Sequence, residues 1–315
     1  MAEHNFQGKS SVCLLEVGPT ARFYCFLESK KYSQYIFYIV FKEPPSIGLN
    51  CVGTPHFASE TTLLTNICQA APFDPPAPPN LRFCGCDFDW RQTSARSFQQ
   101  YGVQRPTQAS RWSRQRQSEY IAGRYCAIQA LTALADHNSP SAMFQIPISD
   151  DLSPRWPHGT VGSISHSQHR AIAIAARDTD YSGMGIDCET LLTDSAAAEI
   201  APWVLQRNDL NCKIEVPLSY GFWITLIFSA KESLFKALAP TYKNVVDFGH
   251  LSSLFFVSRI TEKALILNTE LSFNKRSQFT SQFTSQSSSQ SSSQFELIYR
   301  VDNQQIITMV LLAPQ

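Results

Sequence analysis

The spacing of apolar residues predicts two long amphipathic helices. The first is predicted over residues 114–136, where apolar side chains recur at intervals of three and four residues. Its stripe consists of Ile121, Tyr125, Ile128, Leu131 and Ala135. The second is predicted over residues 220–239, where a similar stripe is followed by Pro240, which we expect to end the helix. That stripe consists of Trp223, Ile227, Ala230, Leu234 and Leu238.

Shorter apolar segments predict β-strands. Residues 21–41 are aromatic and β-branched with one polar interruption, which is typical of a two-stranded hairpin. Farther along, "SISHS" is followed by the alternating "RAIAIAARD", the turn "DTDYSG" and then "MGIDCETL". The last two apolar segments are either one hairpin or two strands joined across a subdomain boundary. Further strand-like runs lie at residues 263–273 and 294–312.

Two segments have compositions typical of loops. Residues 71–80 hold five prolines, which remove backbone hydrogen-bond donors. Residues 277–294 repeat Ser and Gln every four residues, a pattern that buries no apolar face. We interpret this tract as a disordered loop within a hairpin, with an interaction tract as the alternative.

Composition excludes several classes of function. The chain has 26 basic and 26 acidic residues, so no overall field attracts nucleic acid or an anionic membrane. The pI of about 7.0 argues against an RNA-binding protein. There is no signal-peptide pattern, and no apolar run approaches the roughly 20 residues of a membrane span. The nine cysteines include one close pair, "CGC" at 84–86, which we interpret as free thiols rather than a metal site. We therefore expect a soluble, cytoplasmic protein.

Candidate chemistry begins with two acids in "GMGIDCETL". Asp187 and Glu189 project to the same side of a strand, whereas Cys188 points to the other. Adjacent carboxylates repel, and Mg²⁺ relieves this repulsion because it prefers oxygen ligands. Glu232 is a candidate third acid, since it lies on the second helix beside two lysines. A metal with lysines suits a pyrophosphate.

Polar groups upstream fit an anionic ligand as well. Ser165 and His166 in "GSISHS" offer a hydroxyl and a ring nitrogen. On the first helix, Arg116, Tyr120 and Arg124 share a face, which read alone is a solvated surface. The surrounding segment is nevertheless the densest cationic stretch, with Arg105, Arg111, Arg114, Arg116 and Arg124. There is no G-x-S-x-G elbow, P-loop or dinucleotide fingerprint.

Three segments in order carry a family resemblance. "WPHGTVGSISHS", "GIDCE" and "FSAKESLFKAL" together resemble the 4′-phosphopantetheinyl transferases, and among these the enterobactin-synthesis, siderophore type. The upstream "EYIAGR" resembles that family's E-F-L-A-G-R helix, and "CDFDW" resembles a further family segment. The resemblance covers residues 84–240, about half of the chain. It does not reach the first 80 residues or the Ser/Gln tract.

The resemblance implies a metal site. By position, Asp187, Glu189 and Glu232 resemble the Mg²⁺ ligands, with the ion bridging the pyrophosphate of coenzyme A. Lys236 resembles the lysine that contacts the coenzyme's phosphates and protonates the leaving group, and Lys231 is implied as a neighbouring cofactor-binding lysine.

The resemblance also implies a binding site for the adenosine end of the coenzyme. Ser165 and His166 resemble the residues that hold its phosphates, and Arg116 and Arg124 match a cationic helix near the 3′-phosphate. Cys188 departs from the β-branched residue usual in the family, but it faces away from the metal.

The implied reaction transfers 4′-phosphopantetheine to a carrier protein. A serine of an apo acyl or peptidyl carrier attacks the β-phosphate of coenzyme A, and 3′,5′-ADP leaves. Glu232 is the candidate base, directly or through a metal-bound water. The rival is a non-catalytic module of the same fold that binds a carrier protein or a nucleotide. The presence of Asp187, Glu189 and Glu232 argues against that rival, because a binding module has no need for three metal-binding acids.

The implied fold is α+β, with two pseudo-symmetric halves. Each half is a small antiparallel sheet packed on a long helix, and the active site lies at their interface. We expect an N-terminal half at 1–180, in which residues 1–80 form a poorly determined extension, and a C-terminal half at 181–315. Because the pseudo-symmetry lies within one chain, we expect a monomer.

Overall fold

The computed structural model describes residues 10–17, 21–28, 37–41, 62–73, 77–135, 144–242, 255–269, 294–302 and 304–314. Its fold is mixed, with sheets and a few helices. The predicted Ser/Gln loop at 277–294 lies outside the described residues except for Gln294, which begins a strand. The division of the chain at residue 180 stays a prediction. None of the described helices has the length and apolarity that a membrane crossing requires.

The first three strands form an antiparallel sheet in the order β1-β2-β3. Their bounds are β1 (Ser10–Val17), β2 (Ala21–Glu28) and β3 (Phe37–Phe41). The hairpin predicted within residues 21–41 is confirmed, because β2 and β3 are its two strands.

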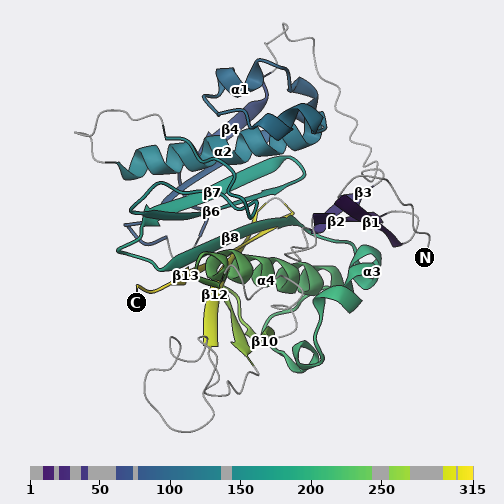
Figure 1. Cartoon of the computed structure of the whole chain (residues 1–315). Coiled ribbons are helices and arrows are strands. Elements are labelled where there is room, and N and C mark those ends of the chain that lie inside the picture. The colour runs from purple at the N-terminus through teal and green to yellow at the C-terminus, as the bar shows by residue number, and fades with distance from the viewer. Residues whose placement is uncertain are drawn as a thin grey trace, which may run out of the picture.

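A four-stranded antiparallel sheet carries the first long helix. Its order is β4-β5-β7-β6, with β4 (Leu64–Cys68), β5 (Arg82–Phe88), β6 (Thr160–Ser167) and β7 (Arg170–Arg177). Helix α2 (Arg114–Leu134) lies over this sheet in Figure 1. Ala171, Ala173 and Ala175 of "RAIAIAA" belong to the α2-facing core. The core on the opposite face contains Ile172, Ile174 and Ala176. Small side chains on one face let the helix approach the sheet.

In the described part of the chain, α2 is preceded by three short helices, namely η1 (Trp90–Gln92), α1 (Ser97–Gln100) and η2 (Thr107–Arg111). Helix α2 begins after Ser113, whose hydroxyl accepts a hydrogen bond from the Arg116 amide at 3.1 Å. Helix α2 ends at Leu134, two residues before the predicted end at residue 136. Cys84 and Cys86 are buried and form no disulfide.

A six-stranded sheet carries the second long helix. Its order is β8-β13-β12-β11-β10-β9, and all pairs are antiparallel except β9 with β10. The strands are β8 (Gly183–Thr190), β9 (Lys213–Ile214), β10 (Phe255–Ile260), β11 (Ala264–Thr269), β12 (Gln294–Asp302) and β13 (Gln305–Leu312). Strands β7 and β8 therefore belong to different sheets, which rules out a single hairpin, whereas the subdomain boundary between them stays a prediction.

Helix α4 (Tyr220–Tyr242) covers the six-stranded sheet together with α3 (Asp194–Val204) and the short η3 (Arg207–Asn211). The prediction that Pro240 ends this helix is wrong, because α4 continues to Tyr242. A proline so near the end removes only one hydrogen-bond donor from the last turn, and the helix tolerates the loss.

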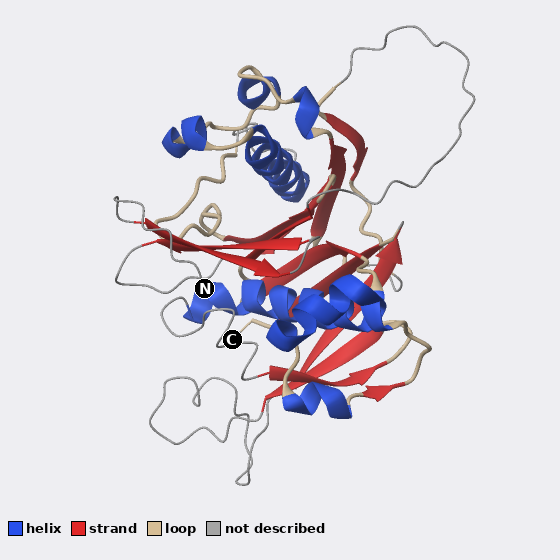
Figure 2. Cartoon of the chain, turned by 90° about the vertical axis from the view of Figure 1, so that its right-hand side faces the viewer, coloured by secondary structure: helices blue, strands red, loops and turns tan. Residues whose placement is uncertain are grey.

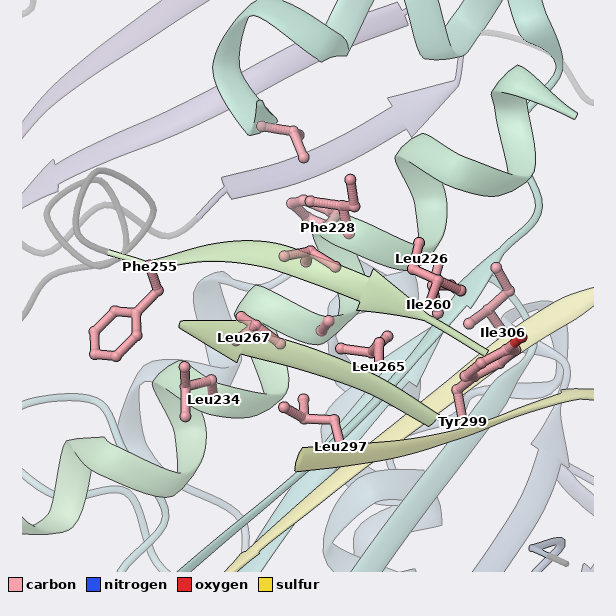
Figure 3. Close-up of a cluster of buried hydrophobic side chains, with 14 of the residues drawn as sticks. Leu226, Phe228, Leu234, Phe255, Ile260, Leu265, Leu267, Leu297, Tyr299 and Ile306 are labelled. Carbon is pink, nitrogen blue, oxygen red and sulfur yellow. The ribbon is translucent and has the colours of Figure 1, made fainter. Parts of the chain in front are cut away.

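The two sheets pack against each other, α2 covers the other face of the four-stranded sheet, and α4 packs against the six-stranded sheet, strands of which lie on both sides of this helix in Figure 2. One apolar core lies between α2 and the four-stranded sheet, and a second lies between the sheets. The third joins α4 to the six-stranded sheet, where Leu226 and Leu234 belong to the same cluster as Leu265 and Leu297 (Figure 3). This layering brings strands β6 and β8 side by side.

Candidate active site

Glycines in "GMGIDCETL" bring strand β8 against helix α4. A Cβ at Gly185 would collide with the carbonyl oxygen of Ser233, and one at Gly183 would collide with that of Ala237. Only glycine permits such a close approach of strand and helix. The contact places the acids of β8 beside the "KESLFK" segment of α4.

Asp187 and Lys236 form the centre of this site. The Lys236 ammonium donates a 2.6 Å hydrogen bond to Oδ1 of Asp187, which also accepts one from the Ser165 hydroxyl at 2.8 Å. Burial lowers the pKa of Lys236, but the nearby Asp187 and Glu232 carboxylates outweigh burial and raise it overall. Lys236 therefore carries its charge throughout the neutral range.

The other two predicted acids lie in the electrostatic field of Asp187. Burial raises the pKa of Glu232 to about 7, and repulsion by Asp187 acts in the same direction. Burial likewise raises the pKa of Glu189 well above its ordinary value, with added repulsion from Asp187 and Glu232. All three acids and Lys236 thus lie within electrostatic range of one another.

The chemistry of these groups suits Mg²⁺. Oδ2 of Asp187 is buried and has no hydrogen-bond partner, which leaves a hard oxygen atom available for a cation. Across the described ranges, no three His, Cys, Asp or Glu side chains already form a metal-ligand cluster. Mg²⁺ does not require one, because proteins hold it through one or two carboxylates plus waters and substrate phosphates. The residues present therefore fit the ion.

A cationic cavity lies on the other side of strand β6. Its volume is about 120 Å³, and its polar lining includes Arg116, Arg124, Glu119 and His166. Arg124 is buried, stacks over the Tyr120 ring at 4.7 Å and donates a 2.6 Å hydrogen bond to the Ile146 carbonyl. The interpretation of this helix face as solvated is wrong for Tyr120 and Arg124, which are buried, whereas Arg116 is partly exposed.

His166 links α2 to this cavity. Its Nε2 lies 3.4 Å from the Arg116 guanidinium and 4.0 Å from Glu119. Burial, together with the charges of Arg116 and Lys236, lowers the pKa of His166 to about 3. His166 is therefore neutral across the physiological range, and the arginines supply the positive charge that an anionic ligand would meet.

Lys231 lies outside this site, which corrects the sequence prediction of a cofactor-binding lysine. Its side chain is fully buried, and its ammonium donates to Oδ2 of Asp209 at 2.7 Å and to the Val204 carbonyl at 2.9 Å. Asp209 also accepts hydrogen bonds from the backbone amides of Gln206 and Val257. The pair joins α4 to η3 and β10, so the role of Lys231 is structural.

Sequence reasoning missed several polar residues around the site. Ser229 and Ser233 on α4 both bond the Thr308 hydroxyl of β13, at 2.9 and 2.7 Å. Their spacing of four residues on one helix face was the available signal. Glu119 was missed as a cavity residue, and burial raises its pKa above the ordinary value.

Comparisons with known proteins agree with these features. Residues 105–176 match the family described as the 4′-phosphopantetheinyl transferase N-terminal domain. The chain is 33% identical to enterobactin synthase component D of Salmonella typhi over 126 residues, which are 40% of this chain and 50% of the relative.

The predicted resemblance to the 4′-phosphopantetheinyl transferases is confirmed.

Two further relatives are named as 4′-phosphopantetheinyl transferases. The transferase Svp of Streptomyces mobaraensis is 35% identical over 98 residues, which are 30% of this chain and 39% of the relative. The transferase PptT of Mycobacterium tuberculosis is 28% identical over 164 residues, which are 50% of this chain and 69% of the relative. The chain thus spans about half the length of the enterobactin synthase component it matches.

The match to the transferase N-terminal domain includes Arg116, Arg124, Ser165 and His166 but ends before the three acids. The residues that line the cationic cavity therefore lie within the segment that matches the family, whereas the three acids lie outside it.

Proposed function

We propose that this chain transfers 4′-phosphopantetheine from coenzyme A to a serine of an apo acyl or peptidyl carrier protein, with Mg²⁺ bound and 3′,5′-ADP released. The observation that carries the proposal is the position of strand β6. One of its faces contributes Ser165 to the Asp187–Lys236 pair, and the other contributes His166 to the cationic cavity. An acid site and an anion site on opposite faces of one strand suit a substrate with phosphates at two places.

In this proposal the active site lies at the interface of two pseudo-symmetric halves. The four-stranded sheet with α2 is one half, and the six-stranded sheet with α4 is the other. Support comes from the Ser165–Asp187 hydrogen bond, which joins an edge strand of each sheet.

The cavity would hold the 3′-phosphate end of the coenzyme. Arg116 and Arg124 would face its charge, and neutral His166 would offer one ring nitrogen as a donor. Because the Ile146 carbonyl and the Tyr120 ring already hold Arg124, little side-chain entropy would be lost when the ligand binds.

Asp187, Glu189 and Glu232 would hold Mg²⁺. When bound, the ion supplies positive charge that neutralises the pyrophosphate and the negative charge that develops on the leaving oxygen. The unpartnered Oδ2 of Asp187 and the raised pKa values of both glutamates support this assignment. Each indicates a buried carboxylate whose negative charge the protein itself does not fully stabilise, and which a bound cation would stabilise.

The chain's own residues would move the proton. The carrier serine hydroxyl attacks the β-phosphorus of coenzyme A, a new P–O bond forms, and the bond to the bridging pyrophosphate oxygen breaks. Glu232 would accept the serine proton, and a pKa of about 7 suits a base near neutral pH. The Lys236 ammonium would donate to the bridging oxygen and stabilise its charge as 3′,5′-ADP leaves.

The partner would be an acidic carrier domain. Between residues 91 and 118 the sequence has arginines at 91, 96, 105, 111, 114 and 116 and no acidic residue. Arg111 and Arg114 are exposed next to the N-terminal end of α2, which lines the cavity. We further propose siderophore biosynthesis as the pathway, the cytoplasm as the location and a monomer as the working form.

The test is transfer itself. The purified protein is incubated with coenzyme A, Mg²⁺ and apo carrier proteins of the siderophore, fatty-acid and polyketide types, and each carrier is weighed by mass spectrometry. We expect a phosphopantetheine mass gain on a carrier. No gain on any carrier, with a known transferase active in parallel, would overturn the proposal in favour of a binding module.

A further inference from the structure

Three serine side chains on strand β6 accept hydrogen bonds from strand β8. The hydroxyl of Ser163 accepts from the Ile186 amide at 3.1 Å, Ser165 from Cys188 at 3.3 Å, and Ser167 from Thr190 at 3.2 Å. Every rung joins residues 23 positions apart, so the two strands run parallel in one constant register. We call these three hydrogen bonds the serine ladder.

The serine ladder provides hydrogen-bond acceptors for backbone amides at the unpaired edge of strand β8, which is buried inside the protein. Strands β6 and β8 are each the edge strand of their own sheet. In an antiparallel sheet, alternate amides of an edge strand point away from its neighbour, and here those amides belong to Ile186, Cys188 and Thr190. Ile186 and Cys188 are fully buried, so water does not replace the serine hydroxyls as acceptors.

The rungs alternate with the two acids of β8. Asp187 lies between the rungs at 186 and 188, and Glu189 lies between those at 188 and 190. A slip of one residue would turn both carboxylates to the opposite face of the strand. The ladder therefore determines which residues of β8 reach the site.

The central rung has no spare hydrogen-bonding capacity. The Ser165 hydroxyl donates to Oδ1 of Asp187 and accepts from the Cys188 amide and from Lys236 at 3.2 Å. A hydroxyl offers one donor and two acceptor positions, and all three are used. This occupancy argues for a role of Ser165 other than coenzyme contact.

We propose that Ser163, Ser165 and Ser167 are positioning residues that hold the two acids of β8 in register with the cationic cavity. The link to the cavity is direct, because Ile164 and His166 alternate with these serines and line it from the opposite face of β6. The inference rests on the proposed function, since it assigns the serines to the same transfer site.

The test removes the first and third hydrogen bonds of the serine ladder, made by Ser163 and Ser167, whose hydroxyls form no hydrogen bond with Asp187 or Glu189 in the described structure. Ser163→Ala, Ser167→Ala and the double variant are compared with Ser97→Ala. Ser97 is a matched control, because it is equally buried and its hydroxyl accepts from the Ser94 amide at 3.0 Å, away from the site. The readouts are kcat, KM for coenzyme A, Mn²⁺ affinity by electron paramagnetic resonance and the midpoint of thermal unfolding.

We expect the double variant to lose about tenfold in Mn²⁺ affinity and in kcat, which is typical of removing groups that orient metal ligands. The KM for coenzyme A should change less than twofold, because the cavity residues are untouched. Ser97→Ala should lower the unfolding midpoint and leave kcat and Mn²⁺ affinity unchanged. Ser167→Thr retains the hydroxyl and should restore both quantities. If the double variant does not fold, the single variants carry the comparison.

Two outcomes separate this inference from the proposed function. If the wild type transfers phosphopantetheine and the alanine variants match it in kcat and Mn²⁺ affinity, the positioning role is wrong and the function stands. If the wild type transfers to no carrier but binds Mn²⁺ more tightly than the alanine variants do, the function is wrong and the positioning role stands. A wild type that transfers to no carrier and binds no Mn²⁺ would overturn both.

Discussion

The Lys236 ammonium lies 2.6 Å from Oδ1 of Asp187, while Oδ2 of the same carboxylate is buried without a hydrogen-bond partner. One oxygen is thus held by the protein and the other is left for a ligand. This asymmetry distinguishes the pair from an ordinary structural ion pair, in which both oxygens would be satisfied.

Asp187→Asn should abolish most of the transfer activity. The amide retains the shape of the side chain but removes its charge, so we expect kcat to fall by more than about 100-fold, the loss typical of a group acting on developing charge. Mn²⁺ binding should be lost while the circular dichroism spectrum stays native. A fully active Asp187→Asn protein would show that the metal assignment is wrong.

Glu232 should make the metal-free protein less stable as the pH rises. Its pKa is about 7 in the folded state against 4.5 ordinarily, so the folded state binds more protons between these values and stability falls as the pH rises through this window. Thermal unfolding at pH 5 and pH 7.5 measures the change. Glu232→Gln should reduce the loss, and an unchanged loss would contradict the assigned pKa shift.

Lys231→Ala should destabilise the fold rather than weaken coenzyme binding. It leaves the buried Asp209 carboxylate without its cation, which costs about 3–5 kcal/mol in comparable buried pairs. Chemical denaturation gives the free energy of unfolding. The double variant Lys231→Met with Asp209→Asn should recover part of the loss. A stable Lys231→Ala protein with a raised KM for coenzyme A would restore the original sequence prediction.

Gly185→Ala should affect both stability and transfer. The added methyl group would meet the Ser233 carbonyl and push α4 away from β8, at a cost of about 1–3 kcal/mol, as for other overpacked sites. Because Asp187 and Lys236 lie on the separated elements, kcat should fall as well. Gly102→Ala is the control for kcat: nothing lies within 4 Å of a Cβ there, and its cost in stability comes from a positive φ of 64°, far from the site, so it should leave kcat unchanged. Wild-type kcat in Gly185→Ala would show that this contact does not set the site geometry.

Reversing the charge of Arg111 and Arg114 should weaken the carrier interaction. Both side chains are exposed, and we expect the KM for the carrier to rise about tenfold, equivalent to about 1.4 kcal/mol. The KM for coenzyme A should stay within twofold. Arg207→Glu with Arg300→Glu changes the charge equally on the six-stranded side. Equal effects from both pairs would mean that only overall charge matters.

Much of the secondary structure could be predicted because periodicity is a local property. The predicted helix at 114–136 is found at 114–134, and the strand that carries Asp187 and Glu189 is β8. The prediction for Pro240 was wrong, because one missing donor near a helix end is a small cost when the helix face is buried.

The site could be predicted only as a set of residue types. Arg124 and Lys231 are both cations on predicted helices, yet one lines a cavity and the other pairs with buried Asp209. No sequence pattern separates them, because the difference lies in the element that each helix face meets.

The sequence by itself determined which side chains share a face of a strand or helix, and it placed the family segments in order. Only the tertiary structure decided what each face contacts: Asp187 meets Lys236 across 49 residues and Ser165 across 22, and the serine ladder joins the edges of two separate sheets. The physical reason is that hydrogen bonds and ion pairs depend on distances of a few ångströms. Between residues far apart in the chain, the packing of whole layers sets such distances.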